Sequence, residues 1–346
     1  ASECAFLLKD GTVWVWKISE AEMFSEGNKN MIPKKKDELN NIKGIGSGLL
    51  CLYALDQEGS IFSWGSGGDG ALGDGLVVQN YPIKNGVYIP EYKENTEKVV
   101  SNYSCGGYRI NKDGTVDHYI KGEYGSKINL NGLSNVIDIF AGNDYILALK
   151  NDGTVWALGA NKYGQLGDGT TVDRMSPVKV TNLSGIIDIK TSDKNQSDFC
   201  SFALTRDGTV WAWGKNDKGL LGDGTNTNRK TPVELTDSEG KVLSGFIDIK
   251  VSNSHILALR NDGTVWTWGK NEYGQLGDGT TIDRYKPDMV TNLSRVISIA
   301  AKNNGSLALK DNGTAWGWGS NITGALGTGN NTVYYNPTRV IGLNNI

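Results

Sequence analysis

The chain has few of the residues on which catalytic and metal sites depend. It is 346 residues long, yet it contains only 2 His, 4 Cys and 7 Pro. His118 and His255 occupy different places in the pattern described below, and no H-E-x-x-H, phosphate-binding loop or Ser/His/Asp order is present. Paired acidic residues recur at regular intervals, whereas a reaction needs one unique constellation. We therefore expect a protein that is not an enzyme and that uses no cofactor.

Long apolar runs and a strong excess of charge are also lacking. No segment approaches the roughly 18 apolar residues that span a bilayer, so we expect no membrane insertion. The formal net charge is -3, and the basic cluster Lys34–Lys36 is followed at once by Asp37 and Glu38. Phosphate binding requires a clustered basic face. The sequence thus predicts no nucleic-acid partner.

What the chain has in abundance is repetition. The segments NDGTVWALGANKYGQLGDGT and NDGTVWTWGKNEYGQLGDGT, around Gly153 and Gly263, nearly superimpose, and weaker copies follow in the same register. The seven marker glycines are Gly11, Gly59, Gly114, Gly153, Gly208, Gly263 and Gly313. Their spacing of about 50 residues lies in the range of propellers and solenoids.

Each repeat predicts four antiparallel strands. In one copy, residues 246–250 alternate with period two, residues 256–259 form a short apolar run, and residues 264–268 follow an Asp-Gly turn. Asp-Gly between strands favours a type I′ turn, in which both central residues have positive φ. The fold class is therefore all-β: a seven-bladed β-propeller of four-stranded antiparallel blades, in a single domain over residues 1–346.

The two ends of the sequence are expected to close the ring together. The tail 337–346 matches residues 177–186, which lead into a strand of the type 187–189. The N-terminus supplies only the following apolar run and the turn Asp10-Gly11. One strand of the closing blade is thus unaccounted for; either that blade is incomplete or the native chain extends further, and we favour the second interpretation.

The pattern A-L-x-x-D-G-T-V-W-x-W-G-x-N-x-Y-G-Q-L-G-D-G-T resembles the repeat of the regulator of chromosome condensation family, in a bacterial-looking version. The resemblance is strong from about 136 to 340 and weak before that. It implies a seven-bladed propeller, in agreement with the repeat count. It does not imply one function, because the family includes a guanine-nucleotide exchange factor, a plant ultraviolet receptor and a secreted bacterial inhibitor of β-lactamases.

Most conspicuous motifs are explained by the fold. Trp-x-Trp pairs such as Trp266/Trp268 recur in phase with the repeat, so they are expected to pack between blades. The Gly-Asp-Gly stretches, as at Asp168, lack the spacing of a calcium loop and are expected to build tight turns through side-chain bonds to backbone N–H groups.

The cysteines fall mostly in one column of the repeat. Cys51, Cys200, Tyr145 and His255 all stand eight residues before a marker glycine; Cys4 and Cys105 are displaced by one position. By family resemblance this column opens the innermost strand and faces the central channel. Packing as small hydrophobes is the favoured interpretation, while a metal site and disulfides stay open.

The loops of the predicted blades indicate where a partner would bind. In an up-and-down sheet, the loop before the apolar strand and the long loop carrying N-x-Y-G-Q-L-G share one side. That side varies in sequence and carries aromatic residues, which are suited to anchor a partner. The family's β-lactamase inhibitor looks similar in this placement, although this chain has fewer aromatics there. The expected contact residues are Leu49, Leu50, Tyr103, Asp144, Tyr145, Tyr163, Phe199, His255 and Tyr273.

We therefore expect a monomeric, non-enzymatic scaffold that binds a protein, extracellular or on the surface of a bacterium. Three alternatives remain open: an inhibitor of β-lactamase or another cell-wall enzyme, a guanine-nucleotide exchange factor for a small GTPase, and a sugar-binding propeller.

Overall fold

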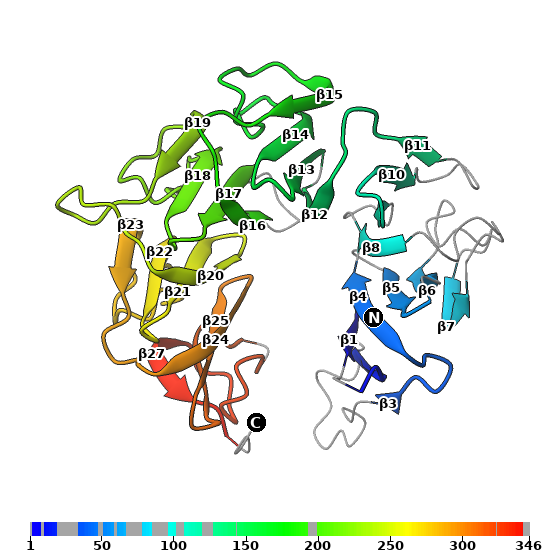
Figure 1. Ribbon diagram of the computed structural model, residues 1–346. Helices are drawn as coiled ribbons and strands as arrows, with labels where there is room; N and C mark the ends of the chain where they lie inside the picture. The colour runs from blue at the N-terminus through cyan, green and yellow to red at the C-terminus, as the bar shows by residue number, and fades with distance from the viewer. Residues whose placement is uncertain are drawn as a thin grey trace. The chain divides into compact units, whose positions relative to one another are not determined.

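The computed structural model describes residues 2–7, 10–18, 34–47, 51–58, 61–66, 78–84, 96–101, 107–119, 127–142, 144–192, 199–322 and 324–341. Every regular element in these ranges is a β-strand, which confirms the all-β class (Figure 1). Within the same ranges, no helix is long and apolar enough to span a membrane. The chain divides into two compact units, residues 1–143 and 144–346. The prediction of one domain over the whole chain is not tested by this division.

The first unit contains the irregular repeats. The first sheet has the order β1-β2-β3, with β1 at Ser2–Leu7, β2 at Val13–Ile18 and β3 at Lys34–Lys35. The second comprises β4 (Ile42–Ser47), β5 (Cys51–Asp56), β6 (Ile61–Ser66) and β7 (Val78–Lys84). The third comprises β8 (Thr96–Ser101), β9 (Gly107–Asn111), β10 (Val116–Tyr119) and β11 (Lys127–Asn129). Among the described residues, the first sheet has three strands and lacks the first strand that begins each of the other sheets, as predicted. Closure of the ring by the two termini stays a prediction.

The regular repeats form four antiparallel sheets of four strands (Figure 1). Their first strands are β12 (Val136–Ala141), β16 (Ile186–Thr191), β20 (Phe246–Val251) and β24 (Val296–Lys302). The second strands are β13 (Tyr145–Lys150), β17 (Cys200–Thr205), β21 (His255–Arg260) and β25 (Gly305–Lys310). The third are β14 (Val155–Gly159), β18 (Val210–Gly214), β22 (Val265–Gly269) and β26 (Ala315–Gly319). The fourth are β15 (Arg174–Lys179), β19 (Arg229–Glu234), β23 (Arg284–Met289) and β27 (Tyr334–Arg339).

The Asp-Gly segments form hairpin turns, but not of the expected type. Gly153 has φ 75°, whereas Asp152 is not among the described residues with positive φ. The N–H of Gly153 donates to the carbonyl of Lys150 at 2.9 Å, and the N–H of Lys150 donates to the carbonyl of Thr154 at 2.9 Å. This is a three-residue loop that ends in a left-handed glycine and a bulge. The type I′ prediction was wrong because Asp152 Oδ1 instead accepts the Thr154 N–H and hydroxyl, at 2.9 and 2.6 Å.

The short apolar strand is not the innermost strand of its sheet. In the order β16-β17-β18-β19, β17 lies between two neighbours, and the strand at the sheet's edge is β16. First strands of successive repeats contact each other, as β16 contacts β20 and β20 contacts β24. Strands such as β17 and β21 are buried over five successive residues because sheets cover both of their faces and strands both of their edges. The expected position of this strand at a central channel was therefore wrong.

In three regular repeats, the second indole of the Trp-x-Trp pair joins two neighbouring repeats. Trp268 of β22 is fully buried among Phe202, Leu220 and Leu235, which belong to the preceding repeat. Its Nε1–H donates to the backbone carbonyl of Leu220 at 2.7 Å. Trp213 and Trp318 donate in the same way to the carbonyls of Gln165 and Gln275, both at 2.9 Å. The packing role predicted for these pairs is confirmed.

Candidate functional site

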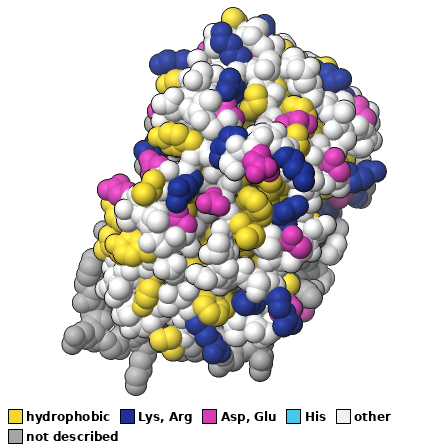
Figure 2. Space-filling model, turned by 90° about the vertical axis from the view of Figure 1, so that its left-hand side faces the viewer, with side chains coloured by type: hydrophobic (Ala, Val, Ile, Leu, Met, Phe, Trp, Pro, Cys, Tyr) yellow, Lys and Arg dark blue, Asp and Glu magenta, His cyan; other side chains and the backbone are white. Residues whose placement is uncertain are grey.

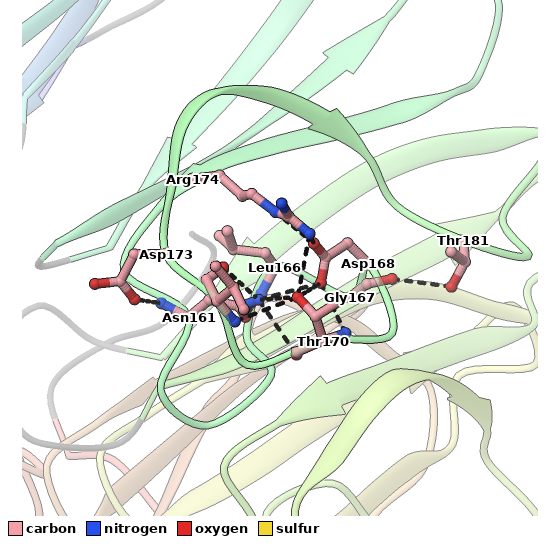
Figure 3. Close-up of polar contacts among 9 residues, drawn as sticks. Asn161, Leu166, Gly167, Asp168, Thr170, Asp173, Arg174 and Thr181 are labelled. Carbon is pink, nitrogen blue, oxygen red and sulfur yellow. Dashed lines mark hydrogen bonds and ion pairs between the residues drawn. The ribbon is translucent and has the colours of Figure 1, made fainter.

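The long loop between the third and fourth strands is built around one buried asparagine. Figure 3 shows Asn161 surrounded by Asp168, Thr170 and Arg174. The Asn161 Nδ2 donates to Asp168 Oδ1 at 3.1 Å and to the Thr170 carbonyl at 3.2 Å, while its Oδ1 accepts the N–H of Leu166 at 3.0 Å. A single side chain thus supplies hydrogen bonds to groups of the loop that would otherwise have no partner within the fold.

In three regular repeats, the aspartate of the Gly-Asp-Gly stretch serves this loop. Asp168 Oδ1 also accepts the N–H and the hydroxyl of Thr170, at 2.9 and 2.7 Å, and its Oδ2 accepts Arg174 Nε at 2.8 Å. These hydrogen bonds hold the pKa of Asp168 below its ordinary value, against the effect of burial, which raises it. Asp223 and Asp278 repeat the arrangement with Arg229 and Arg284. The turn-building role predicted for these aspartates is confirmed.

The two loops of a repeat lie together on one side, which we call the long-loop face. Among the described residues, it comprises those before the second strand (144, 192, 199, 252–254 and 303–304) and those after the third strand (160–173, 215–228, 270–283, 320–322 and 324–333). In each repeat the two segments are hydrogen-bonded: Lys215 N–H donates to the Phe199 carbonyl at 2.9 Å, and Lys270 N–H to that of Ser254 at 2.8 Å. The predicted sharing of one side by these loops is borne out within each repeat.

Tyr163 and Phe199 form an aromatic pair on this face. Their rings stack with centroids 5.4 Å apart and an angle of 15° between planes. The ammonium groups of Lys162 and Lys215 lie 5.3 and 5.2 Å from the centroid of the Tyr163 ring. Tyr163 comes from one repeat and Phe199 from the next, at the end of the longest connection between a first and a second strand in the regular repeats. At the junction that follows Tyr273, the position equivalent to Phe199 is Asn304, which is not aromatic.

A buried glutamine fixes the backbone of each tyrosine. Gln165 Oε1 accepts the N–H of Tyr163 at 2.9 Å, and Gln275 Oε1 accepts that of Tyr273 at 2.9 Å. Both glutamines are buried. The Gln165 carbonyl additionally accepts the Trp213 indole. Tyr163 is therefore held in place by the same residue that joins two repeats, which lowers the entropy lost when a partner orders it.

Two of the expected contact residues are buried within the fold. The Tyr145 hydroxyl donates to the Cys200 carbonyl at 3.0 Å, and burial raises the pKa of Tyr145 above its ordinary value. His255 is fully buried, and burial lowers its pKa to about 3. Tyr145 and His255 are therefore too buried to contact a partner, and their assignment as contact residues was wrong. The sequence pattern correctly placed them at the start of second strands. It could not predict which residues of the folded chain cover their side chains.

The ring nitrogens of His255 both face serine hydroxyls. Nε2 lies 2.7 Å from Ser306 Oγ, whose hydroxyl donates to the Gln275 carbonyl at 2.8 Å. Nδ1 lies 2.7 Å from Ser252 Oγ, whose hydroxyl donates to the His255 carbonyl at 2.7 Å. This neutral, fully buried imidazole, with a serine hydroxyl beside each nitrogen, serves the packing between repeats. Among the described residues, no group of three or more His, Cys, Asp or Glu could hold a metal ion.

The remaining expected residues divide by exposure. Asp144 is exposed, while Tyr163, Phe199 and Tyr273 are half-buried. Leu49, Leu50 and Tyr103 lie outside the described residues, as does Cys105. Cys200 is buried in the core among apolar side chains, which agrees with its predicted packing role.

Three exposed apolar residues on the long-loop face escaped the sequence pattern. Val172 is 58% exposed, Ile282 61% and Ile322 64%. Each lies beside the anchoring asparagine or beside the aspartate that accepts the asparagine N–H. Val172 and Ile282 could have been found from the tip of the long loop, where two repeats carry Thr-Thr-Val and Thr-Thr-Ile in place of the Thr-Asn-Thr of a third. On the face drawn in Figure 2, basic and acidic side chains are interspersed, with no extended patch of one sign.

Comparison with known proteins agrees with this architecture. The chain is 32% identical over 268 residues to the mouse E3 ubiquitin-protein ligase HERC2, covering 72% of this chain but only 5% of HERC2. It is 28% identical over 304 residues to the ultraviolet-B receptor UVR8 of Arabidopsis thaliana, covering 82% of this chain and 66% of UVR8.

Two solved structures share the fold. Prp20p of Saccharomyces cerevisiae matches with a TM-score of 0.72 at 21% identity, over 97% of this chain and 87% of Prp20p. Human WBSCR16 matches with a TM-score of 0.71 at 20% identity, over 91% of this chain and 88% of WBSCR16. Both are β-propellers built from the same kind of repeat, so the propeller fold is confirmed.

The model of the regulator of chromosome condensation (RCC1) repeat matches residues 152–194, 207–259, 262–309 and 312–346, which together make up just over half of the chain. A second model of the repeat extends the match to residue 136. The chain therefore belongs to the RCC1 repeat family.

Proposed function

We propose that this chain is a non-enzymatic scaffold that binds a protein through its long-loop face. The observation that carries the proposal is the stacked pair of Tyr163 and Phe199 with Lys162 and Lys215 beside it. Aromatic side chains on a rigid support are the residues that contribute most to binding in protein interfaces. The other regular repeats carry Asp144, Ser254 and Asn304 at the position of Phe199, so the pair distinguishes one junction, as is expected of a recognition element.

The distribution of apolar surface supports this choice of face. Val172, Ile282 and Ile322 are exposed there, whereas the exposed tips of the Asp-Gly hairpins on the other side are polar, as at Asn151 and Asp262. Exposed apolar groups near aromatic anchors add to the area that a partner can bury.

The relatives support a protein partner without naming it. Prp20p is described by its binding to Gsp1p and histones, and it has also been seen bound by Kap60. HERC2 is a ubiquitin ligase, of which this chain matches 5%. These partners differ, and what they share is that each is a protein. The extracellular or surface position on a bacterium remains part of the proposal, and fractionation of the source cells with detection of the chain tests it.

The proposal is tested with the double variant Tyr163→Ala/Phe199→Ala. Proteins captured by the wild-type chain are identified by quantitative mass spectrometry, and each candidate is titrated against the purified chain by calorimetry. We expect the double variant to lose about 2 kcal/mol or more of binding free energy, the loss typical of hot-spot residues. Asn151→Ala, an exposed change on the hairpin side, is the matched control and should bind as the wild type does. Equal binding by the double variant and the wild type, with Asn151→Ala weakened, would overturn the choice of face.

A further inference from the structure

Four Asn-Gly pairs occur in the sequence, at Asn85, Asn131, Asn304 and Asn312. An asparagine followed by glycine can lose ammonia spontaneously, because the glycine N–H is not shielded by a side chain. Asn85 lies outside the described residues. The other three pairs lie in turns, and they differ in the hydrogen bonds of the asparagine side chain and of the glycine N–H.

Asn131 and Gly132 occupy the two central positions of an exposed turn. The N–H of Leu133 donates to the carbonyl of Leu130 at 3.1 Å, which closes the turn around them. Gly132 has φ 94°, as the third residue of a type II turn requires. Both residues are exposed, and among the described residues neither the Asn131 side chain nor the Gly132 N–H takes part in a hydrogen bond. The reacting nitrogen and the reacting carboxamide are thus both open to water and to each other.

Asn312 and Gly313 are also in an exposed turn, but they are restrained. The Gly313 N–H donates to the carbonyl of Lys310 at 3.0 Å. The Asn312 Oδ1 accepts the N–H of Thr314 at 3.2 Å and its hydroxyl at 2.7 Å. The carboxamide is therefore turned toward Thr314, and the nitrogen that would attack it is engaged elsewhere.

Asn304 is held by its neighbour from another repeat. The Ser254 hydroxyl donates to Asn304 Oδ1 at 2.7 Å and lies 3.0 Å from the Asn303 carbonyl. Gly305, which would supply the attacking nitrogen, opens strand β25 opposite Lys302. Rotation of the carboxamide would break the contact between the repeats.

We propose that Asn131 is a site of spontaneous deamidation in the folded protein, and that Asn304 and Asn312 are protected by their hydrogen bonds. The Gly132 nitrogen loses its proton and attacks Asn131 Cγ; a C–N bond forms, the Cγ–Nδ2 bond breaks, and the side-chain nitrogen takes up one proton and leaves as ammonia. Water then opens the cyclic imide at either carbonyl and gives aspartate or isoaspartate. The product places a new negative charge in the turn between β11 and β12.

The test follows all three peptides in one sample. The full chain is incubated at mildly alkaline pH, digested, and analysed by mass spectrometry for the gain of mass and for isoaspartate at each Asn-Gly pair. Two hydrogen bonds of ordinary net strength correspond to about tenfold in rate, so Asn131 should be modified at least that much faster than Asn312. In the same chain unfolded in urea, the three rates should converge, which shows that the difference comes from the fold.

The outcome that overturns the proposal is modification of Asn312 or Asn304 as fast as Asn131 in the folded chain. A difference that persists unchanged in urea overturns it as well, since local sequence would then be its cause. Removal of the reactive amide by Asn131→Gln should abolish the signal from this peptide and leave the other two peptides unaltered. This test is independent of any binding partner.

Discussion

One cross-strand pair in the core of the third repeat differs in kind from its counterparts in the regular repeats. In the regular sheets an alanine of the second strand faces a tryptophan of the third, as Ala148 faces Trp156 and Ala258 faces Trp266. In the third repeat Arg109 faces Asp117 at the same register. Both partners have changed, and a small apolar residue beside a large one has become a buried ion pair with Nη2 and Oδ2 2.6 Å apart. The comparison teaches that the repeat constrains pairs of residues and the volume they fill, not each residue by itself.

The largest expected effect on stability comes from removing one partner of the buried ion pair. Arg109→Ala leaves the Asp117 carboxylate buried without its guanidinium, so we expect a loss of about 3–5 kcal/mol in the free energy of unfolding of the first unit. The double variant Arg109→Ala/Asp117→Trp rebuilds the pair of the regular repeats and should recover most of that loss. Denaturant unfolding measures both. A double variant no more stable than Arg109→Ala would show that the surroundings of this pair, and not the pair alone, have diverged.

An intermediate effect is expected from comparing the two indoles of one regular pair. Trp268→Phe leaves the buried Leu220 carbonyl without its donor, which costs about 1–3 kcal/mol. Trp266 is only half-buried, and its Nε1 donates over 3.3 Å to the Thr264 hydroxyl, so Trp266→Phe should cost less. Thermal unfolding of the two variants checks the order. The reverse order would mean that the bond between repeats contributes little.

The smallest expected effect is a gain in stability at Arg295. This residue has φ 59°, whereas Gly185 and Gly245 hold the equivalent left-handed position with φ 64° and 81°. This conformation destabilises a residue that has a Cβ atom by roughly 1–2 kcal/mol. The ion pair of Arg295 with Asp311 is exposed and contributes little to stability. Arg295→Gly should therefore raise the free energy of unfolding by about 0.5–1 kcal/mol, after the added flexibility of the unfolded chain is subtracted. Gly245→Arg is the converse change and should destabilise; unchanged or lower stability of Arg295→Gly would contradict the strain.

Local features of the fold could be predicted from the sequence because they depend on neighbouring residues. The hairpins at Gly153 and Gly263, the aspartate turns at Asp168, and the second strands that open at Tyr145 and Cys200 all lie where the repeat indicated. The type of hairpin turn was missed, since the bond from Thr154 to Asp152 competes with the backbone geometry that Asp-Gly alone favours.

Contacts between repeats could not be predicted, because residues far apart in the chain make them. The stack of Phe199 on Tyr163 depends on how two successive sheets lie against each other. The burial of His255 depends on Ser306, 51 positions away.

The sequence by itself determined the repeat, the all-β class and the face on which the loops vary, since strand periodicity and turn chemistry act over a few residues. Only the tertiary structure decided which strand lies at the edge of each sheet and which of the expected contact residues keep an exposed surface. The physical reason is that burial is a property of the neighbours that packing brings together, and identical positions in two repeats can meet different neighbours.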